Sequence, residues 1–135
     1  MAAIRKRLAS FFFFAVIAWG ALKVSRPNYL PLPLDRCSTR QFDATVWRDS
    51  VQAYGNGAPR GCMVDDLLAH HDLIGHGRAE VVSLLGEPRP TNYFQEYDLV
   101  YWLGPERSVL SLDSEWLVVR LDSAGRVTER RIVTD

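Results

Sequence analysis

The chain has no excess of charge of either sign: its 135 residues carry 16 basic and 16 acidic side chains. Three of the basic residues, Arg5, Lys6 and Arg7, lie in the first 22 residues, where there is no acid, so 13 basic residues face 16 acidic ones in the remainder. Domains that bind nucleic acids generally present an excess of positive charge. The composition therefore argues against a nucleic-acid partner.

The sequence also lacks the common short motifs of catalysis. It contains no Gly-x-Ser-x-Gly nucleophile motif. Gly75 and Gly77 lead into an apolar helix without the third glycine or the Lys-Ser/Thr pair of a phosphate-binding loop. Neither cysteine has a histidine near it in a recognisable motif. We therefore expect no enzyme activity, no cofactor and no small-molecule substrate.

Cysteine is scarce, with only Cys37 and Cys62 present. In an oxidising compartment the two could form a disulfide that closes a loop of about 25 residues and stabilises the fold by roughly 3 kcal/mol in the chain-entropy model. Neither cysteine directly follows a hydrophobic segment in the small-residue context of a lipid-attachment site. Two interpretations stay open here, a disulfide and two unpaired thiols.

Long hydrophobic runs are also scarce, and the one present covers residues 8–22, between Arg7 and Lys23. Preceding basic residues and an apolar run are typical of a secretory signal or a short membrane anchor. The run would rise about 22 Å as a helix, which is short for a hydrocarbon core of roughly 30 Å. Whether it is cleaved or retained stays open. In both cases the domain is expected on the far side of the membrane, either membrane-anchored or exported to the periplasm.

Three segments follow from this pattern. Residues 1–22 are the signal peptide or membrane anchor. Residues 23–40 contain Pro27, Pro31 and Pro33 without helical or strand periodicity, so we predict an extended linker. Residues 41–135 are long enough for one small domain.

The domain is predicted to begin with a helix that Asp43 caps. In this helix of about 11 residues, Phe42 would pack on Trp47, and Trp47, Val51 and Tyr54 would share one face. A loop over residues 54–59 would end it.

Two further helices are predicted before residue 88. Residues 62–71 would bury a stripe of Met63, Val64, Leu67 and Leu68. The next helix has both ends marked in the sequence, because Gly77 stands at the N-cap, Glu80 at the third helical position, and Gly86 and Pro88 at the end. Its apolar stripe comprises Val81, Leu84 and Leu85.

Strand patterns follow. Residues 97–103 alternate, with Tyr97, Leu99, Tyr101 and Leu103 on one face and Asp98, Val100 and Trp102 on the other, and Gly104-Pro105 is expected to end the strand. Residues 115–122 and 126–133 flank the turn 123–125 as a hairpin, with Leu117, Val119 and Leu121 facing the helices. The fold class predicted is α+β, with two or three short N-terminal helices packed on a three-stranded antiparallel β-sheet.

A capped helix of this kind before an aromatic-rich strand resembles the SmpA/OmlA (BamE-like) family of small outer-membrane assembly lipoproteins. The resemblance covers roughly residues 63–133. The matching positions are Gly75, Glu80, Val81, Leu84, Leu85, Gly86 and Pro88, followed by the strand 97–103. Two family features are absent, namely a threonine at the helix cap, where Gly77 stands, and a lipid-attachment cysteine after the signal.

The resemblance implies a non-catalytic protein-interaction module of the cell envelope. Such a module would present one sheet face or the loop 104–113 to a protein partner. Because inhibitors of β-lactamase share this layered architecture, an exported or tethered domain with an inhibitor-like binding role is the alternative.

Trp102 is the main candidate for partner binding. It falls on the face opposite Leu99 and Leu103, beside Asp98, and an aromatic side chain on an uncovered face is typical of binding surfaces. Arg120 belongs to a polar set on the hairpin that is either a solvated face or a charged rim of the same surface. Packing within a core remains the alternative for Trp102.

His70 and His76 are the candidates for metal chemistry. Asp66 and His70 lie four residues apart, and His76 follows closely, which could give a divalent metal three ligands. Aspartates in the first turn of a helix and histidines in the last turn are, however, what the helix dipole favours. We therefore expect no metal site and keep a metal-dependent enzyme using His70 and His76 as a lesser alternative.

Overall fold

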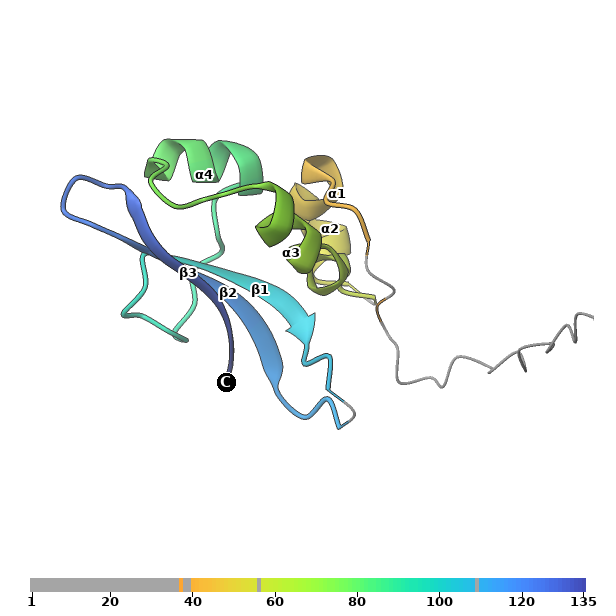
Figure 1. The fold of residues 1–135 in the computed structure, drawn as a ribbon. Helices are drawn as coiled ribbons and strands as arrows, with labels where there is room; N and C mark the ends of the chain where they lie inside the picture. The colour runs from red at the N-terminus through yellow and green to blue at the C-terminus, as the bar shows by residue number, and fades with distance from the viewer. Residues whose placement is uncertain (1–36, 38–39, 56, 109) are drawn as a thin grey trace, which may run out of the picture.

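The computed structural model describes Cys37 and residues 40–55, 57–108 and 110–135. Helices lie on one side of an antiparallel sheet of strand order β1-β2-β3 (Figure 1). This is the α+β class that the sequence predicts. The elements in these residues are α1 (Ala44–Arg48), α2 (Ser50–Ala53), α3 (Pro59–His70), α4 (Arg78–Leu85), β1 (Leu99–Pro105), β2 (Ser114–Leu121) and β3 (Val127–Thr134).

The predicted signal or anchor, residues 1–22, and all of the predicted linker except Cys37 and Arg40 lie outside the described residues. In the described part of the chain, no helix has the length and apolar character needed to cross a membrane.

The first predicted helix is two short helices instead. Asp43 caps α1 as expected, because its carboxylate accepts hydrogen bonds from the backbone N–H groups of the next turn at 2.8 and 3.1 Å. The prediction of one helix is wrong because Asp49 is extended and its carboxylate caps α2, accepting from Val51 N at 2.9 Å. An aspartate side chain that bonds to nearby backbone N–H groups competes with a continuous helix in this way.

The break also changes which side chains are buried. Trp47 is fully buried and Phe42 packs on it, with ring centroids 5.7 Å apart, as predicted. Val51 is 80% exposed, so the expected common face with Trp47 is wrong.

Helix α3 begins three residues earlier than predicted. Pro59 stands in its first turn, where a missing N–H costs nothing and the fixed backbone angle suits a helix. The predicted stripe is present: Met63, Val64 and Leu67 are buried, and Leu68 is partly buried. The added first turn carries Arg60, whose buried guanidinium donates from Nε to the Trp47 carbonyl at 2.8 Å.

Helix α4 confirms the strongest local prediction. Gly77 is its N-cap, and the Glu80 carboxylate accepts a hydrogen bond from Gly77 N at 2.7 Å. Gly86 ends the helix at a φ of +80°, which glycine adopts without strain. Val81 and Leu85 are buried, while Leu84 is partly buried.

Strand β1 differs from the prediction at both ends. It begins at Leu99, so Tyr97 precedes the strand and packs with the opposite face from Leu99. It continues through Gly104 and Pro105, so the predicted break there is wrong. Its register shifts between Trp102 and Gly104, where Gly104 has a φ of +131°. The proline is tolerated because β1 is an edge strand and needs no donor on its outer side.

The hairpin of β2 and β3 forms as predicted. Gly125 has a φ of +74°, and the Asp122 carboxylate fixes the turn by accepting from Ala124 N and Arg126 N, each at 2.9 Å. Leu117 and Val119 are fully buried toward the helices.

The two faces of the sheet carry separate apolar clusters. The larger one lies between sheet and helices and includes Trp47, Leu67, Leu85, Tyr101 and Leu117. The Tyr101 hydroxyl donates to the Gly86 carbonyl at 2.9 Å, and burial raises the pKa of this phenol well above its usual range. The smaller cluster, on the opposite face, comprises Tyr97, Val100, Trp116 and Val118, with Phe94, Trp102 and Val133 against it.

Candidate functional site

Two tryptophans lie side by side on the sheet face that points away from the main core. Trp102 on β1 is directly opposite Trp116 on β2 in the antiparallel register. Both belong to the smaller apolar cluster; Trp116 is 9% exposed and Trp102 is partly buried. Because cross-strand partners stand close together, the two indoles are neighbours and give this face an aromatic surface.

Tyr54, at the end of α2, extends this surface. Its ring stacks on Trp102 with centroids 5.5 Å apart and planes 6° from parallel. The guanidinium of Arg89 lies 4.0 Å from the Tyr54 ring centroid, a cation–π contact. Arg89 is exposed and forms no ion pair with a carboxylate among the described residues.

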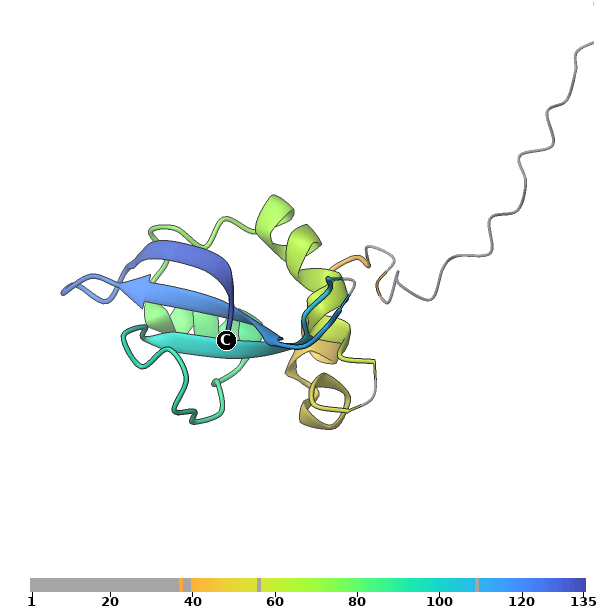
Figure 2. The same ribbon diagram turned by 90° about the horizontal axis from the view of Figure 1, so that it is seen from below.

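The segment between α4 and β1 covers the other end of the surface. It leaves the helix layer and passes to the other side of the sheet (Figure 1), and in the view from below it loops out beside the edge strand β1 (Figure 2). Tyr93 and Phe94 pack on Trp116, with ring centroids at 5.3 and 6.1 Å. Phe94 has a φ of +50°, an uncommon conformation for a bulky side chain. Tyr93 keeps 52% of its surface exposed.

Between these groups lies an opening of about 310 Å³, which we call the aromatic cleft. The indole Nε1 of Trp116 is buried and has no hydrogen-bond partner, although a buried donor normally has one. The cleft is lined by Tyr54, Arg89, Pro90, Thr91, Val100, Trp102 and Trp116.

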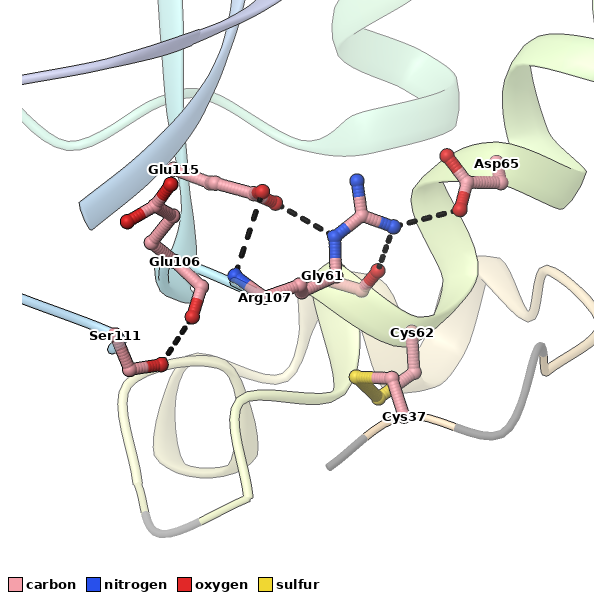
Figure 3. A network of polar contacts seen from close by, with 8 residues as sticks. All are labelled: Cys37, Gly61, Cys62, Asp65, Glu106, Arg107, Ser111 and Glu115. Atoms are coloured by element: carbon pink, nitrogen blue, oxygen red, sulfur yellow. Dashed lines mark hydrogen bonds and ion pairs between the residues drawn. A yellow bond between two sulfur atoms is a disulfide. The ribbon is translucent and has the colours of Figure 1, made fainter. Parts of the chain in front are cut away.

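A second cleft, of about 560 Å³, adjoins the same rings. Tyr54 and Trp102 line it together with Cys37 and Arg107. Cys37 is held there by a disulfide to Cys62 on α3, with an S–S distance of 2.05 Å (Figure 3). Of the two interpretations left open by the sequence, the structure contains the disulfide. The chain therefore enters the domain beside the Tyr54–Trp102 stack.

Asp98 and Arg120, the other two predicted interaction residues, do not gather around Trp102. Asp98 lies four residues before Trp102, about 13 Å along an extended chain. Its carboxylate accepts a hydrogen bond from Leu121 N at 2.6 Å. Arg120 Nε lies 3.1 Å from a Glu129 carboxylate oxygen, and the bond to Glu129 raises the pKa of this guanidinium. Both side chains thus have contacts within the sheet.

Arg107 forms a network that the sequence does not reveal. Its Nε lies 2.7 Å from the Glu115 carboxylate, and its Nη1 lies 2.6 Å from Asp65 and 3.1 Å from the Gly61 carbonyl (Figure 3). Burial alone would lower the pKa of Arg107, but the hydrogen bonds to Asp65 and Glu115 outweigh it, and the pKa is raised. The network holds the base of the β1–β2 loop against α3.

The tip of that loop is apolar and exposed. Leu110 is 74% exposed and Leu112 is 79% exposed. The Ser111 hydroxyl donates to the Glu106 carbonyl across the loop. The loop 104–113 therefore presents leucines to solvent from a base that Arg107 fixes.

The histidines have separate partners. His70 Nδ1 lies 3.0 Å from Asp66, His76 Nδ1 lies 3.4 Å from Glu80, and His71 packs on the ring of Phe42 at 5.1 Å. His70 and His76 do line one depression of about 440 Å³. Within the described ranges, however, no three His, Cys, Asp or Glu side chains are grouped closely enough to hold a metal ion.

Sequence reasoning identified Trp102 but not its neighbours Tyr54, Arg89 and Trp116. Tyr54 is predicted to share a face with Trp47 on a single helix that does not form, and nothing in the local sequence singles out Arg89. Trp116 directly precedes Leu117, which the alternation along residues 115–122 directs toward the helices, and this pattern implies the opposite face for Trp116. No protein-family model, curated protein or solved structure matches the chain.

Proposed function

We propose that this protein is a non-catalytic protein-interaction module of the cell envelope, which binds its partner through the sheet face around Trp102. The observation that carries the proposal is the aromatic cleft. It exposes an aromatic surface next to a cation, Arg89, that no described carboxylate neutralises. Binding surfaces are enriched in Trp, Tyr and Arg, and a few such residues supply most of the binding energy.

The rest of the proposal comes from the sequence. The basic and apolar N-terminal run supports a domain that is membrane-anchored or periplasmic. The capped helix α4 before an aromatic strand supports kinship with the SmpA/OmlA (BamE-like) proteins. Fractionation of cells, with mass measurement of the mature N-terminus, tests the location. Recovery of the protein with its N-terminus intact in the cytosol would contradict it.

The binding proposal is tested with Trp102→Ala. Tagged protein is crosslinked in envelope extract, and captured proteins are quantified by mass spectrometry. We expect a partner recovered with the wild type to be lost with Trp102→Ala and retained with Val51→Ala, which truncates an exposed apolar side chain on α2. Thermal unfolding of both variants checks that they are folded. Unchanged recovery with folded Trp102→Ala would remove this face from the binding site.

The exposed loop supports a second candidate function, an inhibitor-like role. Leu110 and Leu112 project from a loop whose base is fixed by Arg107, and a braced loop inserts into a cleft at low entropic cost. The test is recovery with Leu112→Ser. Loss with this variant and retention with Trp102→Ala would favour the loop over the sheet face.

A further inference from the structure

The aromatic cleft favours an apolar peptide over other ligands, and this inference rests on the proposed binding function. A cationic ligand would be repelled by Arg89, the charged group in its lining. A sugar needs several polar partners, but the uncharged polar side chains of the lining are few, namely Thr91, Tyr54 and the two indoles. The indole faces and the Val100 side chain, which line the cleft, can pack against proline and leucine side chains.

The buried indole N–H of Trp116, on this face of the sheet, points to the same class. Trp116 Nε1 is buried without a partner. A polyproline II segment has no internal hydrogen bonds and offers its carbonyls outward as acceptors. Aromatic-lined grooves bind such segments because little conformational entropy is lost. Tyr93, which packs on the same indole, is half exposed.

The chain itself carries a fitting sequence. Residues 30–35 have the sequence Leu-Pro-Leu-Pro-Leu-Asp, and only Arg36 separates them from Cys37. Cys37 is fixed in the wall of the adjoining cleft with Tyr54 and Trp102, the rings that both clefts share. Six residues of polyproline II reach about 19 Å. The same stretch includes Asp35, whose charge is opposite to that of Arg89.

We propose that the aromatic cleft binds residues 30–35 of the same chain. The segment and an external partner then compete for Trp102. A protein partner whose binding is governed by this competition would itself carry an apolar, proline-containing stretch with an acidic residue.

The test follows the indole N–H signals of the full chain by NMR in detergent, with ¹⁵N-labelled tryptophan. We expect Pro31→Ala/Pro33→Ala to shift the Trp102 and Trp116 signals and to leave that of Trp47, in the main core, unchanged. Pro27→Ala, which alters the same linker outside the segment, is the matched control and should shift none of them. A peptide with the sequence of residues 29–36, added to the double variant, should restore the wild-type signals saturably. Trp102→Ala should weaken peptide binding at least tenfold.

Two results would overturn the inference. One is identical Trp102 and Trp116 signals in the wild type and the double variant. The other is a wild-type shift that fades on dilution, which would assign the bound segment to a second copy of the chain. Either result would leave the proposed function intact if partner recovery still depended on Trp102. If the proposed function is wrong, partner recovery will not depend on Trp102, whatever the indole signals show.

Discussion

The Arg107 network allows a quantitative test of how the β1–β2 loop is held. Arg107→Met keeps the aliphatic part of the side chain and removes the charge. The Glu115 side chain is only 12% exposed, so it would be left as a largely buried, unpaired carboxylate. Breaking a buried ion pair from one side costs about 3–5 kcal/mol, and the partial exposure of Arg107, 25%, places the expected loss near the lower limit, at about 3 kcal/mol.

The two carboxylates that Arg107 contacts should respond differently. Asp65 is 56% exposed, so Asp65→Asn should cost less than about 1 kcal/mol, as an exposed ion pair does. In Glu115→Gln the buried position keeps a hydrogen-bond acceptor but loses its charge, and we expect a loss of about 1–2 kcal/mol. The double variant Arg107→Met/Glu115→Gln should be less destabilised than the sum of the single variants, because no buried charge is left unpaired.

Urea unfolding followed by tryptophan fluorescence measures these free energies. In thermal unfolding, a loss of about 3 kcal/mol should lower the midpoint temperature by about 12–24 °C in a domain of this size. If Asp65→Asn and Glu115→Gln lowered the free energy of unfolding equally, the reasoning would be refuted, because the burial of the carboxylate would then not determine the loss of stability. Strictly additive effects of Arg107→Met and Glu115→Gln would refute the pairing itself.

Three further predictions concern other parts of the fold. Replacing both Cys37 and Cys62 by alanine opens a loop with a sequence separation of 25 and should lower the free energy of unfolding by about 3.5 kcal/mol, measured against the wild type with and without reductant. Tyr101→Phe leaves the Gly86 carbonyl without its donor and should cost about 1–2 kcal/mol in the same assay, and no loss would show that this bond adds nothing net. The pKa of Glu80 lies below its ordinary 4.5 because the N-cap N–H and then His76 hydrogen-bond to the carboxylate. The stabilisation from the ionised carboxylate is thus complete above pH 4.5 and is lost as the pH falls through the lowered pKa. In Glu80→Gln the free energy of unfolding should therefore fall less steeply at acid pH than in the wild type. An unchanged dependence on pH would contradict this prediction.

Local sequence signals predicted the elements whose ends are set by neighbouring residues. Helix α4 depends on Gly77, Glu80 and Gly86, which act within one short segment, and its bounds were predicted. The β2–β3 turn was predicted for the same reason, since the left-handed residue at Gly125 lies inside it. Asp49 carries the same kind of local signal, because a capping aspartate inside a helical pattern indicates a break, and the prediction of one continuous helix fails at this residue.

The candidate site was only partly predictable because its parts come from distant segments. The alternation in β1 placed Trp102 on the correct face. Tyr54 reaches it only because α2 is a separate helix, and Arg89 only because the segment after α4 crosses to the far face of the sheet. The grouping of Arg107 with Asp65 and Glu115 likewise depends on tertiary packing, which no local periodicity records.

The first turn of α3 is where distant parts of the chain are joined. Arg60 donates to the carbonyls of Trp47 and Trp102, the Gly61 carbonyl accepts from Arg107, and Cys62 carries the disulfide. This turn cannot fray without releasing three segments at once: the chain at Cys37, the edge strand β1, and the β1–β2 loop that carries Leu110 and Leu112. Fraying of this turn should therefore require opening of the whole domain, although helix ends normally open first.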